Sequence, residues 1–421
     1  MKITFVIALL VTVFYKETVQ QCFPPYAGNQ PNRKGYFDLY SGQQEFSLAL
    51  LHAVNKVLPN ENLFFSPYST YHALLMAYFL SGRQTENYLK KVLRLNANQE
   101  KSDLYAAYKI DKFSTQLFAK NASYEFTSAN KIYVENDVPV KTCVLDDFND
   151  ELEMKDFKTN PEQARISINQ WVENVTHHMI RDLIPPGTID SATNLVLVNA
   201  AYFKGLWENK FPEEFTRPEI FYVSPTKQIM VDMMHVEGTF KHDVSESLGA
   251  HILEMPYKGD NISMYVLLPP WSDTQNAIEN TLKNLTLENF KNIVENDNLI
   301  SKTVQVSFPK FSLETTLEMT PILGSIGLEN LFNSNADFSS LSPQPVYLGE
   351  GIHKSRIDVD ENGTQSSSAT AFLGFRIYEG PVTRFICNRT FIYFIYNKKS
   401  HTVLFVGIMR SPNKAESMLG V

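Results

Sequence analysis

Residues 361–370 read ENGTQSSSAT, and the more apolar AFLGFRIY follows at 371–378. If this stretch forms a strand, successive side chains point to opposite faces. One face then carries Thr364, Ser366, Ser368 and Thr370, and the other carries Gln365, Ser367, Ala369 and Ala371. Small, neutral side chains can enter a packed sheet where bulky or charged groups would be excluded. The stretch is therefore compatible with strand insertion.

The flanks of this stretch allow two interpretations. Gly363 can adopt backbone angles that other residues resist, so it suits a hinge. No proline occurs between Gly363 and Gly380, so each residue there can donate a hydrogen bond to a ladder. A Ser/Thr-rich run is also typical of an exposed loop. The choice between an inserting strand and an exposed loop depends on the rest of the chain.

Composition and pattern predict one large α+β domain. The chain has 421 residues, of which 43% are hydrophobic, so it can bury a large core. Helical periodicity dominates the first half and strand-like runs the second, with no internal repeat or long linker between them. The net charge of −8 and the lack of long basic runs argue against nucleic acid as a partner.

The N-terminus predicts secretion. Lys2 precedes an apolar run over residues 3–15, which matches a signal peptide covering about residues 1–20 and is too short to span a bilayer comfortably. Its cleavage site is undefined, and a buried N-terminal strand is the alternative. Six Asn-x-Ser/Thr sequons support passage through the secretory pathway: Asn121, Asn174, Asn261, Asn284, Asn362 and Asn388.

The three cysteines, Cys22, Cys143 and Cys387, allow at most one internal disulfide, and which two of them pair stays open. No Cys/His spacing matches a zinc site. The neighbouring His177 and His178 are expected on the polar face of a helix. We predict no metal and no cofactor.

Local signals place several elements. Helices are expected from Gln43 to Leu58, from Pro67 after the N-cap Ser66 to about Leu80, and from Pro161 to Ile180. Residues 195–203 are expected to form a strand buried on both faces. Further strands are predicted at 251–255, 263–268, 303–308, 391–396 and 403–408.

The chain lacks the compact catalytic motifs. It has no Gly-x-Ser-x-Gly elbow, no Walker loop, no dinucleotide-binding glycine motif and no His-Glu-x-x-His motif. We therefore do not expect an enzyme.

Several segments together resemble signature segments of the serpin family, in the family's order. They are 62–69 (NLFFSPYS), 183–189 (LIPPGTI), 197–207 (LVNAAYFKGLW), 255–260 (MPYKGD), 308–311 (FPKF), His353-Lys354 before Glu361, 391–395 (FIYFI) and 404–407 (LFVG). The resemblance covers roughly residues 40–412.

A serpin resemblance implies a single domain over 21–421 with three β-sheets and about nine helices. It also implies a metastable native state and an exposed reactive-centre loop at about 361–381. The opening stretch falls on the hinge of that loop, with Glu361, Gly363 and Thr364 at the family's usual positions. Small residues follow, as in inhibitory members: Gln365, Ser366, Ser367, Ser368, Ala369 and Thr370.

The implied activity is suicide inhibition of a serine protease. The protease is acylated at the scissile bond, and the cleaved loop then inserts into the central sheet and distorts the triad before deacylation. Arg376–Ile377 is the preferred bond, because arginine suits an acidic trypsin-like specificity pocket. The commoner loop length would place the scissile residue at Ile377, before Tyr378, and cleavage at Tyr378 is the third option.

The resemblance also assigns other residues. Ser66, Ser69, Asn199 and His353 match a polar cluster beneath the sheet that opens, and Trp207 is expected at the top of that sheet near the hinge. A glycan on Asn362 would obstruct insertion, so we predict that this sequon is unoccupied.

The sequence thus predicts a secreted, monomeric inhibitor that forms a covalent complex with an extracellular trypsin-like protease. No membrane partner is expected. No glycosaminoglycan partner is expected either, because Lys90, Lys91 and Arg94 are best explained as a solvated helix face. A non-inhibitory serpin acting as a carrier or storage protein is the alternative, and a secreted hydrolase is a third.

Overall fold

The computed structural model describes residues 22–23, 39–119, 124–259, 261–271, 276–295, 299–349, 351–364 and 383–413. The predicted signal peptide, Asn121 and the loop residues 365–382 lie outside these ranges. The predicted scissile bond, at Arg376 or at the neighbouring Ile377 and Tyr378, is therefore not placed.

The described part of the chain contains nine α-helices. They are α2 (Gln43–Val57), α3 (Pro67–Leu80), α4 (Arg83–Val92), α5 (Lys101–Ala119), α6 (Thr142–Asp147), α7 (Pro161–Val175), α8 (Asn276–Asn284), α9 (Leu287–Val294) and α10 (Met319–Leu323). Short helical turns cover Glu213–Phe215 and Gly324–Phe332. The predicted start of α3 is confirmed: Pro67 is its first residue, and the Ser66 side chain accepts a hydrogen bond from the Ser69 amide at 3.0 Å.

The strands form two sheets within the described residues. The central sheet has the order β10-β11-β4-β2-β3, with β12 added beside β4. Its strands are β2 (Tyr124–Glu135), β3 (Leu152–Lys155), β4 (Leu195–Leu206), β10 (Phe311–Glu318), β11 (Gly351–Val359) and β12 (Gly363–Thr364).

The second, nine-stranded sheet has the order β1-β15-β14-β8-β7-β6-β9-β13, with β5 beside β6. Its strands are β1 (Leu63–Phe65), β5 (Arg217–Ser224), β6 (Lys227–Ser245), β7 (Ala250–Pro256), β8 (Ile262–Leu268), β9 (Ile300–Pro309), β13 (Thr383–Ile386), β14 (Phe391–Asn397) and β15 (Thr402–Met409). The strands that the sequence predicted at 195–203, 251–255, 263–268, 303–308, 391–396 and 403–408 are all present.

The expected third sheet is not separate in the described residues. The reason is the 19-residue strand β6, whose first part pairs with β5 and whose last part, from Lys241 to Ser245, pairs with β7. One continuous ladder therefore joins two groups of strands that the family resemblance counts as two sheets. The α+β class and the set of about nine helices agree with the prediction.

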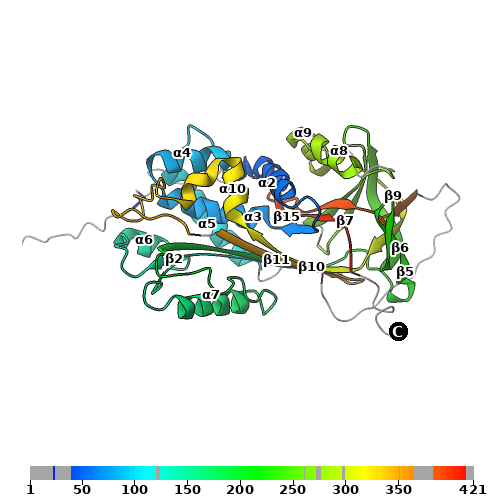
Figure 1. Cartoon of the computed structure of the whole chain (residues 1–421). Helices are drawn as coiled ribbons and strands as arrows, with labels where there is room; N and C mark the ends of the chain where they lie inside the picture. Colours follow the sequence, from blue (N-terminus) through cyan, green and yellow to red (C-terminus); the bar gives the residue numbers. More distant parts are fainter. Residues whose placement is uncertain are drawn as a thin grey trace, which may run out of the picture.

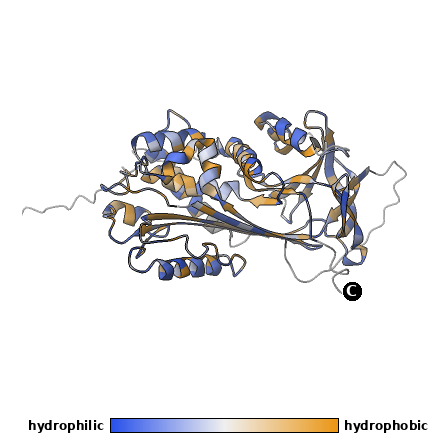
Figure 2. Ribbon diagram, in the orientation of Figure 1, coloured by the Kyte–Doolittle hydropathy of each residue, from blue (hydrophilic) through white to orange (hydrophobic). Residues whose placement is uncertain are grey.

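Helices lie on both faces of the central part of the sheet, with α7 on one face and the main helical body on the other (Figure 1). Alternate residues of β4 explain why: Val196, Val198, Ala200 and Tyr202 belong to the small core beneath α7, whereas Leu195, Leu197, Ala201 and Phe203 belong to the main core. α3 contacts β4 and β2 from the main-core side. That core continues through the hydrophobic strands β14 and β15 (Figure 2). Because both its faces are covered, β4 is almost entirely apolar from Leu195 to Phe203, with Asn199 as the polar exception.

The prediction for the end of α7 was wrong. The helix ends at Val175, not at Ile180, because the Thr176 hydroxyl donates to Val172 O at 2.7 Å and accepts from Ile180 N at 3.2 Å. His177 and His178 follow with φ of 50° and 63°, so they lie in a left-handed turn and not on a helix face. Each contacts a carboxylate at 3.0 Å, Glu125 for His177 and Glu173 for His178.

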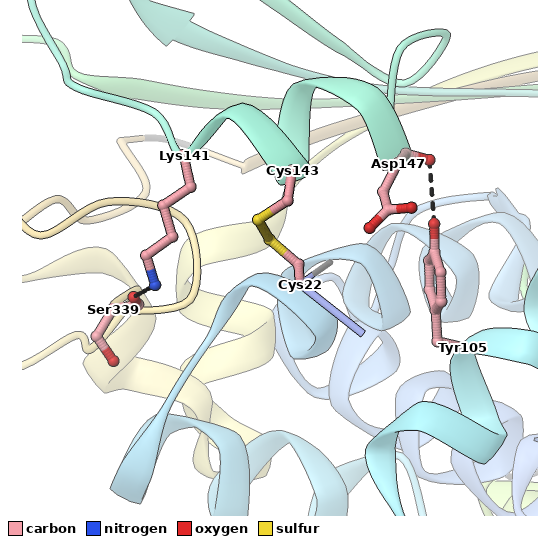
Figure 3. Close-up of a disulfide and its surroundings, with 6 residues drawn as sticks. All are labelled: Cys22, Tyr105, Lys141, Cys143, Asp147 and Ser339. Carbon is pink, nitrogen blue, oxygen red and sulfur yellow. Dashed lines mark hydrogen bonds between the residues drawn. A yellow bond between two sulfur atoms is a disulfide. The ribbon is translucent and has the colours of Figure 1, made fainter. Parts of the chain in front are cut away.

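The N-terminal segment is attached to the body by a disulfide between Cys22 and Cys143, the latter on α6 (Figure 3). Phe23 stacks on Tyr105 of α5 with ring centroids 4.2 Å apart and meets Phe79 of α3 edge-on at 6.0 Å. Cys387 is a free, fully buried thiol, and burial raises its pKa well above the ordinary value. The structure thus settles the pairing that the sequence left open.

Candidate functional site at the loop hinge and central sheet

The two middle strands of the central sheet, β4 and β11, are parallel and pair over only part of their length. Their register runs from Gly351 opposite Leu197 to Arg356 opposite Tyr202. On its other edge β11 pairs with β10 from Ile352 to Val359. Beyond the β4–β11 register the end of β4 pairs with β12, with Gly363 opposite Leu206 and Thr364 opposite Gly205. β12 is antiparallel to β4. The chain therefore leaves β11, reverses direction and starts down the end of β4.

The reversal is a tight turn over Asp360–Asn362. The Asp360 Oδ1 atom accepts hydrogen bonds from the amides of Asn362 at 2.9 Å and Gly363 at 3.1 Å. Gly363 has φ of +143°, and a Cβ atom there would overlap the Gly205 carbonyl oxygen and lie 2.7 Å from Leu206 Cα. Only glycine fits this position.

Trp207 lies directly against this turn, at the place expected from the sequence. Its indole Nε1 donates to Asp360 O at 3.1 Å, and its amide donates to Asn362 O at 2.9 Å. The ring stacks on Tyr257 with centroids 4.5 Å apart and is only 2% exposed. Trp207 thus connects the end of β4 to the hinge by two hydrogen bonds.

Glu361 anchors the same turn to segments that flank β5 and β9 of the second sheet. Its Oε1 atom accepts from the Thr216 hydroxyl at 2.8 Å, its Oε2 lies 3.3 Å from Lys310 Nζ, and its carbonyl accepts from Phe211 N at 2.9 Å. Burial by itself raises the pKa of Glu361, but the hydrogen bonds and the Lys310 charge outweigh it and hold the pKa below its ordinary value. The carboxylate is therefore the stable form.

The polar cluster predicted beneath the sheet is assembled in the structure. Ser66, Ser69, Asn199 and His353 are all buried. His353 Nε2 accepts from Ser66 N at 3.0 Å, and His353 Nδ1 is hydrogen-bonded to Asn199 Oδ1. Asn199 Nδ2 then donates to Ser69 Oγ at 2.7 Å. The chain of bonds joins β11 through β4 to the first turn of α3.

The hydrogen bonds define the protonation state of His353. Since Nε2 accepts the Ser66 amide hydrogen, the ring proton is on Nδ1, where it faces the Asn199 oxygen. Burial lowers the pKa of His353 to about 3, although the bond to Asn199 acts in the opposite direction. A neutral imidazole is thus the form that this cluster holds together.

Two members of the cluster were missed in the sequence. Asn130 and Ser128 on β2 extend it: Asn130 Oδ1 accepts from Ser69 Oγ at 3.3 Å and from Asn199 Nδ2, and Ser128 Oγ donates to Ser69 Oγ at 2.9 Å. In a strand over residues 124–130, successive side chains point to opposite faces, so Ser128 and Asn130 share one face. That alternation was the available signal, but no strand was predicted there.

A cavity lies at the opposite end of the β4–β11 pair from the hinge. It has a volume of about 520 Å³ and is lined by Val196 and Val198 of β4, Ile352 of β11 and Pro321 of α10, among others. Space therefore exists at the end of the two strands where a strand inserted between them would finish.

The remaining predicted sites have varied surroundings. The sequons Asn174, Asn261 and Asn284 are exposed, whereas Asn362 and Asn388 are half-buried. Lys90 Nζ donates to Ala97 O at 3.0 Å, and Arg94 Nε lies 2.7 Å from Glu45 Oε1. These partners satisfy part of the small basic cluster within the protein.

The described ranges contain neither a membrane-spanning helix nor a cluster of metal-ligating side chains. No helix there is long and apolar enough to cross a membrane. Nor do those ranges bring together three or more His, Cys, Asp or Glu side chains that could hold a metal ion.

The fold and the hinge define a class of protein: an α+β molecule whose central sheet has a loop starting at the open end of its two middle strands. The comparisons with known proteins agree. The family model described as Serpin (serine protease inhibitor) matches residues 41–412. The chain belongs to the serpin family.

Individual relatives support this assignment. The chain is 37% identical to "Serine protease inhibitor 88Ea" of Drosophila melanogaster, over 89% of this chain and 91% of that protein. It is 32% identical to "Leukocyte elastase inhibitor A" of Rattus norvegicus, over 89% and 99%. Among solved structures, uncleaved ovalbumin covers 88% of this chain and 99% of its own with a TM-score of 0.78 and 27% identity.

Proposed function

We propose that this protein is a secreted inhibitor that traps trypsin-like serine proteases as an acyl-enzyme by inserting its cleaved loop into the central sheet. The observation that carries the proposal is β12. Gly363 and Thr364 are already paired antiparallel with the end of β4, and the residues that follow them in the sequence are small and neutral. A strand that continued this pairing would run down between β4 and β11.

The proposed reaction uses the protease's own catalytic groups. The protease serine attacks the carbonyl of Arg376, the bond to Ile377 breaks, and the new amine of Ile377 leaves with the proton that the protease histidine delivers. The serpin contributes no catalytic group. Its cleaved loop then replaces the six-residue β4–β11 pairing with two antiparallel ladders, and His353 and Asn199 exchange hydrogen-bond partners as the strands separate.

Specificity and location follow from separate features. Arg376 would form a bidentate pair with the acidic residue of a trypsin-like pocket. The Cys22–Cys143 disulfide favours an oxidising compartment, in agreement with the apolar segment at 3–15. Asn362 lies inside the hinge turn, half-buried, so a glycan there would hinder insertion, and we expect this sequon to be unoccupied in active protein.

The test mixes the purified protein with trypsin and looks for a complex that survives boiling in detergent. A stable complex and a released peptide that begins at Ile377 would support both the trap and the assignment of Arg376. The matched variant R376E should no longer capture trypsin. Cleavage without a complex would favour a non-inhibitory carrier or storage protein, and a peptide that begins at Tyr378 or Glu379 would overturn trypsin-like specificity.

A further inference from the structure

We propose that Asn362 is a site of spontaneous modification, at which the hinge turn converts the asparagine into aspartate and isoaspartate through a cyclic imide. The sequence contains a single Asn-Gly pair, Asn362–Gly363. In this reaction the backbone nitrogen of the following residue attacks the asparagine side-chain carbonyl. A glycine at that position leaves the attacking nitrogen unhindered, because it has no Cβ.

The turn supplies a base for the attacking nitrogen. The Gly363 amide must lose its hydrogen to become a nucleophile. That hydrogen is shared between two oxygens of Asp360, the carboxylate Oδ1 at 3.1 Å and the backbone carbonyl oxygen at 3.2 Å from Gly363 N. A carboxylate within hydrogen-bond distance of the proton can act as a general base. Burial raises the pKa of Asp360 above its ordinary value, which makes its carboxylate a stronger base.

The turn also supplies a cation for the reacting carbonyl. Lys210 Nζ lies 3.4 Å from Asn362 Oδ1, the oxygen on which negative charge develops when Cγ becomes tetrahedral. An ammonium group already in place stabilises that charge without reorganisation. Base, nucleophile, electrophile and cation thus all come from Asp360, Gly363, Asn362 and Lys210, within one turn and the neighbouring segment.

The atoms balance without any reagent except water. Asp360 takes the proton from Gly363 N, the bond from that nitrogen to Asn362 Cγ forms, and the Cγ–Nδ2 bond breaks. The proton passes to the departing nitrogen, which leaves as ammonia. Water then opens the five-membered imide at either carbonyl. One opening gives aspartate with the normal backbone, and the other gives isoaspartate, in which the chain continues through the side-chain carboxyl.

The two products differ in their effect on the hinge. Aspartate places a carboxylate beside Lys210 and preserves the backbone. Isoaspartate adds one methylene to the chain between residue 362 and Gly363, so the turn held by Asp360 and the pairing of β12 with β4 can no longer both keep their present geometry. If the proposed inhibitory function holds, the isoaspartyl form inserts its loop more slowly and is cleaved as a substrate. The reaction would then limit the active lifetime of the inhibitor.

The experiment ages an unglycosylated preparation of the full chain at neutral pH and follows the tryptic peptide 357–376 by mass and by isoaspartyl content. Asn362 is the only asparagine in that peptide. The matched reference is a synthetic peptide of the same residues, which has the Asn-Gly pair but not the folded arrangement of Asp360 and Lys210. Asn333–Ser334, in the same protein sample, serves as an internal comparison.

We expect the folded protein to convert Asn362 at least about tenfold faster than the free peptide does, which is less than the ~10²–10⁴-fold that a well-positioned general base can contribute. Asp360→Ser retains an oxygen acceptor for the turn, removes the base and adds no second asparagine to the peptide, and Lys210→Met removes the cation. Both variants should lower the rate in the folded protein. The same substitution at position 360 in the free peptide should leave the peptide rate unchanged, and Lys210 lies outside that peptide. A folded-protein rate equal to or below the peptide rate would overturn the proposal.

These readouts are chemical, so they are independent of protease inhibition. If the protein forms no complex with trypsin but Asn362 still converts faster when folded, only the proposed function fails. If the complex forms and the Asn362 peptide stays unchanged during ageing, only the modification site fails.

Discussion

His353 is a neutral side chain at the centre of a buried hydrogen-bond network, and this makes the stability of the protein depend on pH. Burial lowers the pKa of His353 from 6.5 to about 3. In the unfolded chain the imidazole binds a proton below pH 6.5, whereas in the folded chain it does so only near pH 3. Its contribution to stability is therefore complete above pH 6.5 and is lost as the pH falls towards 3.

We predict that His353→Gln removes about 1.4 kcal/mol per pH unit from the pH dependence of unfolding over this range, because one proton less is taken up. Denaturant unfolding of both proteins between pH 3 and 7 measures the difference. His72 and His242 also have lowered pKa values, about 3 and about 4, so part of the dependence remains. His177→Gln, at an exposed position, is the control; an identical slope for H353Q and the parent would contradict the assignment.

Single residues were predictable where the family resemblance named them. Ser66, Ser69, Asn199 and His353 come from separate segments, and only the serpin resemblance connected them before the structure did. Asn130 and Ser128 were missed because their strand is only partly buried along its first half and gives no strong apolar signal. The pairing of Cys22 with Cys143 could not be read from spacing, because it depends on how an N-terminal segment returns to α6.

At the scale of elements, a substitution at Gly363 tests whether the pairing of β12 with β4 is needed for inhibition. Alanine there would place a methyl group on the Gly205 carbonyl oxygen, so the backbone has to move away from β4. We predict that Gly363→Ala increases amide hydrogen exchange in 361–364 and lowers the yield of detergent-stable trypsin complex at least tenfold. Cleaved free protein should increase by the corresponding amount.

Gly249→Ala is the matched control for this prediction. Gly249 also has a positive φ, +61°, but no atom lies within 4 Å of the position that its Cβ would take. The Gly249→Ala variant should lose about 1 kcal/mol of stability to backbone strain and leave the yield of trypsin complex unchanged. If both variants reduced the yield equally, strain alone and not contact with β4 would explain the effect.

The elements themselves followed the local sequence closely where caps and periodicity were strong. α2 and α3 and six strands lie where the pattern placed them. The end of α7 was wrong because a side-chain hydroxyl, that of Thr176, competes for the backbone of the last turn. The merging of two expected sheets depends on the length of β6, which is set by pairing with β5, β9 and β7 and not by its own residues.

At the scale of the whole molecule, the Cys22–Cys143 disulfide closes a loop with a sequence separation of 121 residues. Crosslinks across long loops restrict the unfolded chain, so the double variant Cys22→Ser/Cys143→Ser should lose about 2–4 kcal/mol of stability. Denaturant midpoints measure the loss. Reductant should lower the midpoint of the parent to that of the variant and leave the variant unchanged; a further fall in the variant would show that another thiol is involved.

The whole-molecule prediction that bears most directly on the proposed trap concerns the cleaved protein. A protease that cuts the loop between 365 and 376 without being trapped should release it to insert, and each net hydrogen bond gained in the central sheet adds about 1 kcal/mol. A strand of roughly ten residues paired on both sides would then raise the thermal midpoint by on the order of 10 °C or more. Calorimetry of intact and cleaved protein measures this shift.

A matched variant connects that shift to strand insertion. Ser366→Arg places a charge in the part of the loop that has to enter the sheet, where burial of an unpaired guanidinium is strongly unfavourable. It should be cleaved as readily as the parent but gain much less stability. If parent and variant shifted equally, the gain would come from loop cleavage itself. If neither shifted, the β4–β11 pair would stay closed after cleavage, and the non-inhibitory alternative would be the better account of this serpin.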